Sequence, residues 1–278
     1  MNIGVFDSGF GGLTVLRALL DRVPTANYHY LGDSARLPYG SKSPRTVAHY
    51  AASSARYLVD HGADLLVIAC NTASALALDA IRESVPQPVI GVIEPGAAAA
   101  AHASHTKRVC VVATHATIAS RAYTLALAAH GIDSEEKACP LLVPLVEEGW
   151  IDHPVTQQVL RIYLDELAAQ CAHSWSDGMP PDAIVLGCTH YPLLKPLFSR
   201  LLPRGMHLID SADAVADEVA TVAATFAPSQ PADGPATPPH HPTNLRFSAT
   251  DSLEKFRTLG QRFLGRSIRQ VELITLPE

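Results

Sequence analysis

A nine-residue pattern occurs twice in this chain and limits the folds that the chain can adopt. The first copy is Asp64-Leu-Leu-Val-Ile-Ala-Cys70-Asn71-Thr72, and the second is Asp182-Ala-Ile-Val-Leu-Gly-Cys188-Thr189-His190. A short apolar run that ends in small polar residues is typical of a fully buried parallel strand, which leaves the cysteine at its carboxyl end. Ligands bind at that end of the strands in open α/β sheets. We therefore expect the two thiols to face one ligand.

The rest of the chain alternates between predicted strands and helices. Strands are expected at residues 2–6, 28–31, 89–93, 109–113, 245–248 and 270–275, besides the two cysteine strands, with 141–145 as the segment that leads into a polar loop. Helices are expected at residues 13–20, 44–60, 72–83, 118–130, 154–170 and 212–226, and one more opened by a capping box at 251–254. This alternation predicts an α/β fold with mostly parallel, doubly wound sheets.

The order of these parts is the same in both halves of the chain, which predicts two pseudo-symmetric α/β domains with the active site in the cleft between them. We assign residues 1–95 and 206–278 to an N-terminal domain and residues 96–205 to a second domain. Residues 228–242 hold six prolines and almost no large apolar side chain, and this composition predicts an exposed, poorly ordered insertion.

Composition narrows the classes of protein that fit. The chain has 278 residues, of which 47% are hydrophobic, so it can form a large core. Its formal charge of -6, without a Lys/Arg cluster, argues against nucleic acid and membrane partners. No signal peptide and no spanning segment are recognised, so we expect a cytoplasmic protein. The five cysteines lack close CxxC spacing and are expected to be free thiols.

Six short motifs resemble those of one family. They are Asp7-Ser8-Gly9, Pro38-Tyr39-Gly40, Cys70-Asn71-Thr72, Thr114-x-x-Thr117, Leu145-Val146-Glu147 and Cys188-Thr189-His190. All six occur in the order found in bacterial glutamate racemase, a member of the aspartate/glutamate racemase superfamily. The resemblance covers residues 3 to about 226 and, more loosely, the final ordered segment. It implies a cofactor-independent racemase, expected as a homodimer, that makes D-glutamate for peptidoglycan.

Racemisation explains why two cysteines are needed. The α-proton must leave one face of the carbon and a proton must return to the opposite face, which requires a base and an acid on either side. A free thiol is only a few per cent thiolate at pH 7, so each cysteine needs a neighbour that assists its proton transfer. The resemblance implies that Asp7 assists Cys70 and that His190 assists Cys188, with Glu147 orienting the His190 side.

The resemblance also implies the residues that bind the substrate. Most of them offer hydroxyl, amide or backbone N–H groups: Asp7, Ser8, Tyr39, Gly40, Asn71, Thr72, Thr189 and His190. Thr114 and Thr117 either cap a helix or contact the ligand. The matched motifs contain no lysine, so we expect no pyridoxal phosphate and no other cofactor.

Other interpretations compete with this one. Cys70, Cys188, His190 and Asp7 are residue types that zinc accepts, although no CxxC or HxxxH pair supports a metal site. The two thiols would also suit a redox disulfide. Cys110, Cys139 and Cys171 are expected to be buried structural thiols. At the level of function, the alternatives are an aspartate racemase or another two-cysteine isomerase, or a non-catalytic amino-acid sensor or inhibitor protein.

Overall fold

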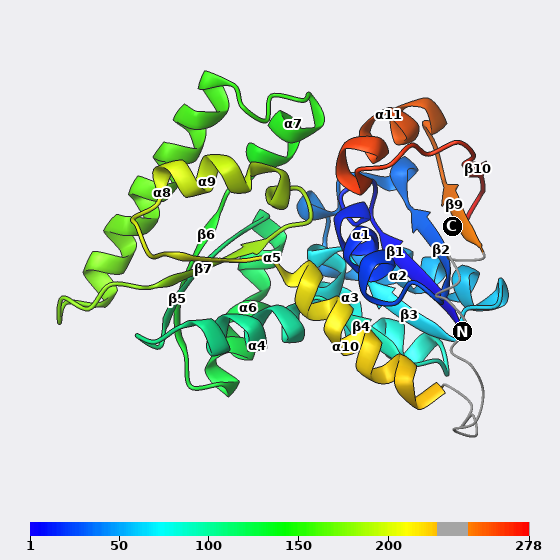
Figure 1. Ribbon diagram of the computed structural model, residues 1–278, viewed down its shortest axis with the longest axis horizontal. Helices are drawn as coiled ribbons and strands as arrows, with labels where there is room; N and C mark the ends of the chain where they lie inside the picture. Colours follow the sequence, from blue (N-terminus) through cyan, green and yellow to red (C-terminus); the bar gives the residue numbers. More distant parts are fainter. Residues whose placement is uncertain (227–243, 278) are drawn as a thin grey trace, which may run out of the picture.

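Two parallel sheets form the framework of the computed structural model, which describes residues 1–226 and 244–277 (Figure 1). The first sheet has the strand order β10-β9-β2-β1-β3-β4 and the second has the order β6-β5-β7-β8. Every strand pair is parallel, as predicted. The strands are β1 Asn2–Asp7, β2 Asn27–Gly32, β3 Leu65–Ile68, β4 Val89–Gly91, β5 Arg108–Ala113, β6 Asp133–Ala138, β7 Ala183–Gly187, β8 His207–Ile209, β9 Leu245–Ala249 and β10 Glu272–Leu273.

The two sheets repeat one topology. In the first sheet the order β2-β1-β3-β4 puts the cysteine strand, β3, third, and in the second sheet the order β6-β5-β7-β8 puts the cysteine strand, β7, in the same position. The repeated aspartates have matching structural roles. Asp64 Oδ2 accepts the Asn2 N–H at 2.8 Å, and Asp182 Oδ2 accepts the His105 N–H at 2.7 Å. Each aspartate therefore ties its cysteine strand to the segment that starts the neighbouring strand.

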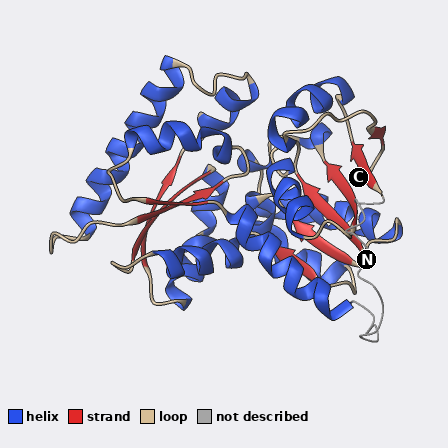
Figure 2. Ribbon diagram, in the orientation of Figure 1, coloured by secondary structure: helices blue, strands red, loops and turns tan. Residues whose placement is uncertain are grey.

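Helices cover both sheets (Figure 2). They are α1 Leu13–Arg22, α2 Pro44–Asp60, α3 Asn71–Ser84, α4 Ile93–Ala103, α5 His115–Ser120, α6 Ala122–Ala129, α7 Leu142–Glu147, α8 Pro154–Ser174, α9 Lys195–Leu201, α10 Ser211–Phe226 and α11 Leu253–Leu264, with short 3₁₀ turns at Ser34–Arg36, Tyr39–Ser41 and Tyr191–Leu194. Among the described residues, none of these helices combines the length and the apolar character needed to cross a membrane.

Local sequence signals explain several helix starts. Ser43 Oγ accepts the Thr46 N–H at 3.3 Å, and Pro44 occupies the first helical position of α2, where its missing N–H costs nothing. The predicted bounds of this helix, 44–60, are those observed. Thr114 Oγ1 likewise accepts the Thr117 N–H at 3.3 Å and caps α5. Polar caps therefore fix where these helices begin.

The structure corrects four predicted elements. The helix expected at 118–130 is two helices, α5 and α6, because Arg121 adopts a left-handed conformation (φ 57°). Residues 142–147 form α7 rather than an extended segment. The capping box at 251–254 does not form, since Ser252 is left-handed (φ 55°) and its side chain makes no cap bond. The second sheet extends past the predicted boundary at 205, because β8 pairs with β7. The Pro-rich stretch 228–242 lies outside the described residues.

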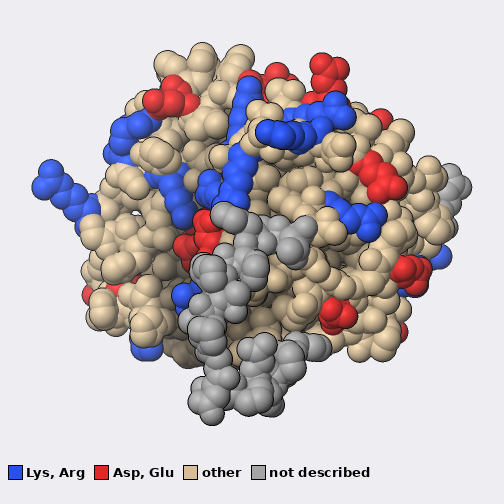
Figure 3. Space-filling view, turned by 45° about the vertical axis from the view of Figure 1, so that its right-hand side comes forward, with Lys and Arg blue, Asp and Glu red and all other residues tan. Residues whose placement is uncertain are grey.

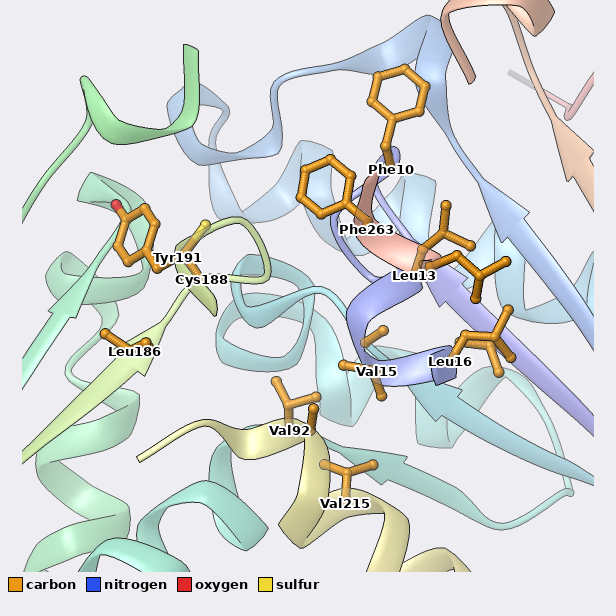
Figure 4. Close-up of a cluster of buried hydrophobic side chains, with 14 of the residues drawn as sticks. Phe10, Leu13, Val15, Leu16, Val92, Leu186, Cys188, Tyr191, Val215 and Phe263 are labelled. Carbon is orange, nitrogen blue, oxygen red and sulfur yellow. The ribbon is translucent and has the colours of Figure 1, made fainter. Parts of the chain in front are cut away.

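The largest hydrophobic core continues from one half of the molecule to the other (Figure 4). Phe10 and Leu13 from the first half and Leu186 and Cys188 from the second belong to this same buried cluster. The helix α10 contributes Val215 and packs against α1 and α4. The ends of the strands of the two sheets are therefore held close together by shared packing.

Candidate active site

The register of the first sheet brings Asp7 and Cys70 to one edge. Phe6 pairs with Ile68, so Asp7, the last residue of β1, lies level with the residue before Cys70. Both side chains are buried, with 1% of Asp7 and 5% of Cys70 exposed. In the second sheet Ala113 pairs with Gly187, which places Thr114 level with Cys188. The two cysteines thus occupy equivalent strand ends, as the repeated sequence predicts.

The Cys70 thiol lies at the N-terminus of α3. Its Sγ atom accepts the Ala73 N–H at 3.4 Å and donates to Ser8 Oγ at 3.4 Å. Burial and the nearby Asp7 carboxylate raise the pKa of the thiol to about 12, against the opposing effect of the Ser8 and Ala73 hydrogen bonds. In the structure as it stands, Cys70 is therefore a neutral thiol at pH 7.

The Cys188 thiol has a different neighbour. His190 Nδ1 lies 3.9 Å from Cys188 Sγ, and His190 Nε2 lies 3.2 Å from Glu147 Oε1. Burial alone would lower the pKa of His190, but the hydrogen bonds to Cys188 and Glu147 outweigh it and raise that pKa to about 10. The Glu147 carboxyl is partly desolvated, yet its bonds to His190 and Lys255 lower its pKa. An imidazolium ion therefore lies next to Cys188 at neutral pH.

Two glycines let the two sides approach each other. A Cβ atom on Gly11 would overlap Thr189 Oγ1 and would lie 2.7 Å from His190 Nδ1. A Cβ atom on Gly12 would lie 2.6 Å from the Cβ of Asp7. Such contacts are too short for any side chain, so only glycine fits at either position. The loop before α1 therefore packs closely against both Asp7 and His190.

Two buried polar atoms at this site have no hydrogen-bond partner among the described residues. Asp7 Oδ2 accepts the Gly9 N–H at 2.8 Å, but Oδ1 has none, and burial raises the pKa of this carboxyl. Asn71 Oδ1 accepts the Tyr123 hydroxyl at 2.7 Å, whereas Nδ2 has none. Buried polar groups are rarely left unpaired except at functional sites. The site thus offers one acceptor and one donor to a bound molecule.

Three threonines meet where the two halves touch. Thr72 Oγ1 lies 3.0 Å from Thr114 Oγ1 and 3.3 Å from Thr117 Oγ1. Gly40 lies against Thr114, since a Cβ atom there would be 3.2 Å from the Thr114 Cβ. Thr114 both caps α5 and joins this hydroxyl cluster, so the two interpretations of this residue are compatible.

The Tyr39 hydroxyl makes a hydrogen bond within the protein. Its hydroxyl donates to Asp33 Oδ2 at 2.6 Å, and Asp33 Oδ1 accepts the Thr250 hydroxyl at 2.9 Å. Asp33 itself is fully buried and was not among the predicted residues, although it lies in the loop flagged by Pro38-Tyr39-Gly40. Tyr39 belongs to the same buried cluster as Cys70, and its hydroxyl anchors the loop.

Two residues that sequence reasoning missed come from α11. Lys255 Nζ lies 3.0 Å from Glu147 Oε2, and the Phe263 ring lies edge-on to His190, with 5.1 Å between ring centroids. Neither residue belongs to a recognisable motif, and both are far from the second half in sequence. The only signal was the predicted helix that follows residues 251–254 and contains them.

The other three cysteines are buried within the second half of the structure. Cys110 and Cys171 lie 3.5 Å apart (Sγ to Sγ), and the Cys139 thiol contacts the carbonyl of Lys137 at 3.6 Å. Among the residues described, no three His, Cys, Asp or Glu side chains are arranged to hold a metal ion. The rival assignment of Cys70, Cys188, His190 and Asp7 as a zinc site thus has no geometric support.

Comparison with known proteins is consistent with this geometry. A glutamate racemase of Koribacter versatilis is 50% identical to the chain, with 99% of the chain and 97% of that protein aligned. The crystal structure of glutamate racemase from Francisella tularensis in complex with D-glutamate has a TM-score of 0.83 at 33% identity, over 99% of this chain and 97% of that one. An aspartate racemase of Picrophilus torridus shares the fold alone, with a TM-score of 0.53 at 18% identity over 80% of this chain and 94% of that one.

The family described as Asp/Glu/Hydantoin racemase matches residues 3–219, which include both cysteines and every predicted site residue. That span covers most of the chain, and the relative from Koribacter aligns over nearly its full length. The chain therefore belongs to the Asp/Glu/hydantoin racemase family and is an amino-acid racemase.

Proposed function

We propose that this chain is a glutamate racemase in which Cys70 and Cys188 move the α-proton without a cofactor. One observation carries the proposal. Each of two repeated sheets ends its equivalent strand in a buried cysteine with its own ionisable neighbour, and the two neighbours, Asp7 and His190, interact electrostatically across the contact between the halves. Moving a proton from one face of a carbon to the other needs an acid and a base on opposite sides of it.

The proton follows a simple route in the proposed mechanism. One cysteine, as a thiolate, takes the α-proton and becomes a neutral thiol. The other cysteine, as a thiol, gives its proton to the opposite face of the carbanion and becomes a thiolate. The reverse reaction exchanges the roles. The raised pKa of Cys70 suits the protonated partner, and the His190 side chain lies next to Cys188, where it can assist proton transfer.

The polar groups of the site suit an amino acid. The unpaired Asp7 Oδ1 can accept a hydrogen bond from the substrate ammonium, and the unpaired Asn71 Nδ2 can donate one to a carboxylate. The hydroxyls of Thr72, Thr114 and Thr117 form a second set of donors. Several neutral donors of this kind can together hold a carboxylate through hydrogen bonds.

Glutamate is favoured over aspartate by the comparisons. The relatives at 42–50% identity over nearly the whole chain are named glutamate racemases, and the Francisella structure holds D-glutamate. The aspartate racemase of Picrophilus is only 18% identical. By the family resemblance, the D-glutamate formed supplies peptidoglycan in the cytoplasm, and the enzyme is a homodimer; these three points stay predictions.

A racemisation assay tests the proposal. Purified protein should convert L-glutamate into the racemic mixture with no added cofactor, and L-aspartate should react far more slowly, both followed by loss of circular dichroism. Cys70→Ala and Cys188→Ala should each reduce the rate by about 10³-fold or more, because each removes an acid and a base at once.

Cys171→Ala serves as the matched control, because Cys171 is a buried thiol of α8 that contacts Cys110. This variant should racemise at the parent rate. Glutamate binding without any change in optical activity would instead favour the sensor or inhibitor alternative, and a faster reaction with aspartate would reassign the substrate.

A further inference from the structure

The helix α11 reaches across to the ionisable pair of the second half. It carries Lys255, Arg257 and Arg262 on exposed positions, while Phe256, Leu259 and Phe263 form its buried face. Figure 3 shows Lys and Arg side chains gathered along the upper part of the face that it draws. Lys255, Arg257 and Arg262 give α11 three exposed cations in a chain whose formal charge is -6. Lys255 makes the most specific contact of the three.

Lys255 stands at the end of a row of four polar side chains. Its Nζ atom lies 3.0 Å from Glu147 Oε2, and the other oxygen of Glu147, Oε1, lies 3.2 Å from His190 Nε2. His190 Nδ1 in turn lies 3.9 Å from Cys188 Sγ. Each Glu147 oxygen therefore has one cationic partner, and the two partners come from different halves of the molecule.

Other contacts hold α11 in this position. The Phe263 ring packs edge-on against His190 at 5.1 Å, and Lys255 Nζ lies 5.6 Å from the centre of the Phe10 ring. Gly149, just after α7, is left-handed (φ 81°), and a Cβ atom there would lie 2.6 Å from Arg262 Nη1. The end of α7 that carries Glu147 is thus enclosed by α11 on one side and His190 on the other.

A glutamate side chain has three rotatable bonds, so one partner does not fix it. With both oxygens occupied, its carboxylate is held in the plane that joins Lys255 to His190. We infer that Lys255 is a positioning residue that holds Glu147 in the orientation in which it supports His190 beside Cys188, an inference that rests on the proposed two-cysteine reaction. Because Lys255 belongs to the first half, this support exists only when the two halves are together.

The effect of removing Lys255 has a definite sign. The groups that face His190 are Cys188, Glu147 and Asp7, with Lys255 behind Glu147. Losing a nearby cation would by itself raise the pKa of His190, but Lys255 is 52% exposed and is screened by water, whereas the Glu147–His190 pair is largely buried. Without Lys255 the Glu147 carboxylate is free to turn away from His190, and the weakening of this largely buried hydrogen bond outweighs the lost repulsion, so the pKa of His190 should fall.

Lys255→Met and Lys255→Arg test the inference, with Arg257→Met as the matched control, since Arg257 is an exposed cation of the same helix. Lys255→Met should lower kcat/KM for glutamate about tenfold, the effect of one charged hydrogen bond. The bell-shaped dependence of its kcat/KM on pH should narrow. The acidic limb, set by the pKa of Glu147, should move to higher pH, and the basic limb, set by the pKa of His190, should move to lower pH. Lys255→Arg should recover most of the loss, and Arg257→Met should match the parent.

A measurement without turnover separates this inference from the proposed function. The midpoint of the His190 imidazole signal, titrated by NMR in the free protein, should be about 10 in the parent and clearly lower in Lys255→Met. A midpoint that is unchanged, or that rises, would overturn the positioning role whether or not the protein racemises glutamate. If the parent protein shows no racemase activity but the midpoint of His190 is still lower in Lys255→Met, only the proposed function is contradicted, and the positioning role stands.

Discussion

At the scale of single residues, the two thiols of the site are chemically different. Cys70 is buried beside a carboxylate, which raises its pKa to about 12, and Cys188 is beside an imidazole that keeps its proton up to pH about 10. In the proposed two-cysteine reaction, each thiol must still act as the base for one of the two enantiomers. The asymmetry therefore means that substrate binding has to change the proton balance at Cys70.

The buried carboxylate of Asp7 lowers the stability of the folded protein, and this gives a prediction. Burial raises the pKa of Asp7 above its ordinary value of 3.8, so the ionised carboxylate destabilises the folded state at neutral pH. Asp7→Asn keeps an oxygen for the Gly9 N–H and removes the charge. It should therefore stabilise the protein by about 1 kcal/mol at pH 7 while greatly slowing racemisation, as happens when a strained functional group is relaxed.

Urea unfolding of the parent and of Asp7→Asn between pH 8 and pH 4 measures this effect. For a carboxyl with a raised pKa in the folded state, the penalty is absent below pH about 3.8 and is greatest above the raised pKa, so the gain should shrink as the pH falls. An Asp7→Asn protein that is no more stable than the parent at pH 7 would show that other contacts neutralise the buried charge.

At the scale of elements, the periodic and capped segments were predictable and the exceptions have physical causes. The helix at 44–60 has a serine cap and a proline start, and its bounds were correct. The strand β6, Asp-Ser-Glu-Glu-Lys-Ala, was missed because it is an edge strand with no fully buried residue, so its sequence lacks the apolar pattern of a parallel strand. The residues 142–147 were apolar enough for a strand but too few to show a helical period.

In the site, too, residues that follow a local sequence pattern were predictable, and residues that contact it from a distant part of the chain were not. The residues at the strand ends were predicted, because a parallel sheet collects its carboxyl ends at one edge. The structure brings Asp7, Ser8, Cys70 and Asn71 together on one side and Cys188, His190 and Glu147 on the other, with the threonines between the halves. Lys255 and Phe263 were not predictable, because their partners come from α7 and the end of β7, which no local pattern links to α11.

The loop before α1 gives a prediction at this scale. Gly11→Ala would place a methyl group against Thr189 and His190, which are themselves buried and cannot move aside freely. The variant should keep its fold, because the clash lies at the contact between the halves, but kcat/KM should fall about 100-fold through misplacement of His190. Far-ultraviolet circular dichroism and the glutamate assay together measure the two effects.

Gly131→Ala is the contrasting variant. Gly131 has a positive φ of 69° and no atom near its Cβ position, so alanine there adds backbone strain away from the site. It should lower the free energy of unfolding by about 1 kcal/mol and leave kcat/KM unchanged. Equal losses of activity in Gly11→Ala and Gly131→Ala would mean that general destabilisation, rather than the contact with His190, explains the effect.

At the scale of the whole molecule, the proposed reaction depends on a duplicated sheet whose copies have diverged at the ends of their strands. The shared topology delivers two thiols, and the differences between Asp7 and Ala113, or between Asn71 and Thr189, give each thiol its own setting. The common core and the Lys255–Glu147 pair hold the copies together. The central claim is that one thiol serves each face of the substrate.

The most direct test is the early reaction of L-glutamate in D₂O, with both enantiomers separated and analysed by mass spectrometry. If two thiols act on opposite faces, the first D-glutamate formed should carry deuterium at the α-carbon while the remaining L-glutamate keeps its hydrogen, because the donating thiol has exchanged with solvent. Deuterium that appears in both enantiomers at the same early rate would mean that a single base serves both faces, and would contradict the account.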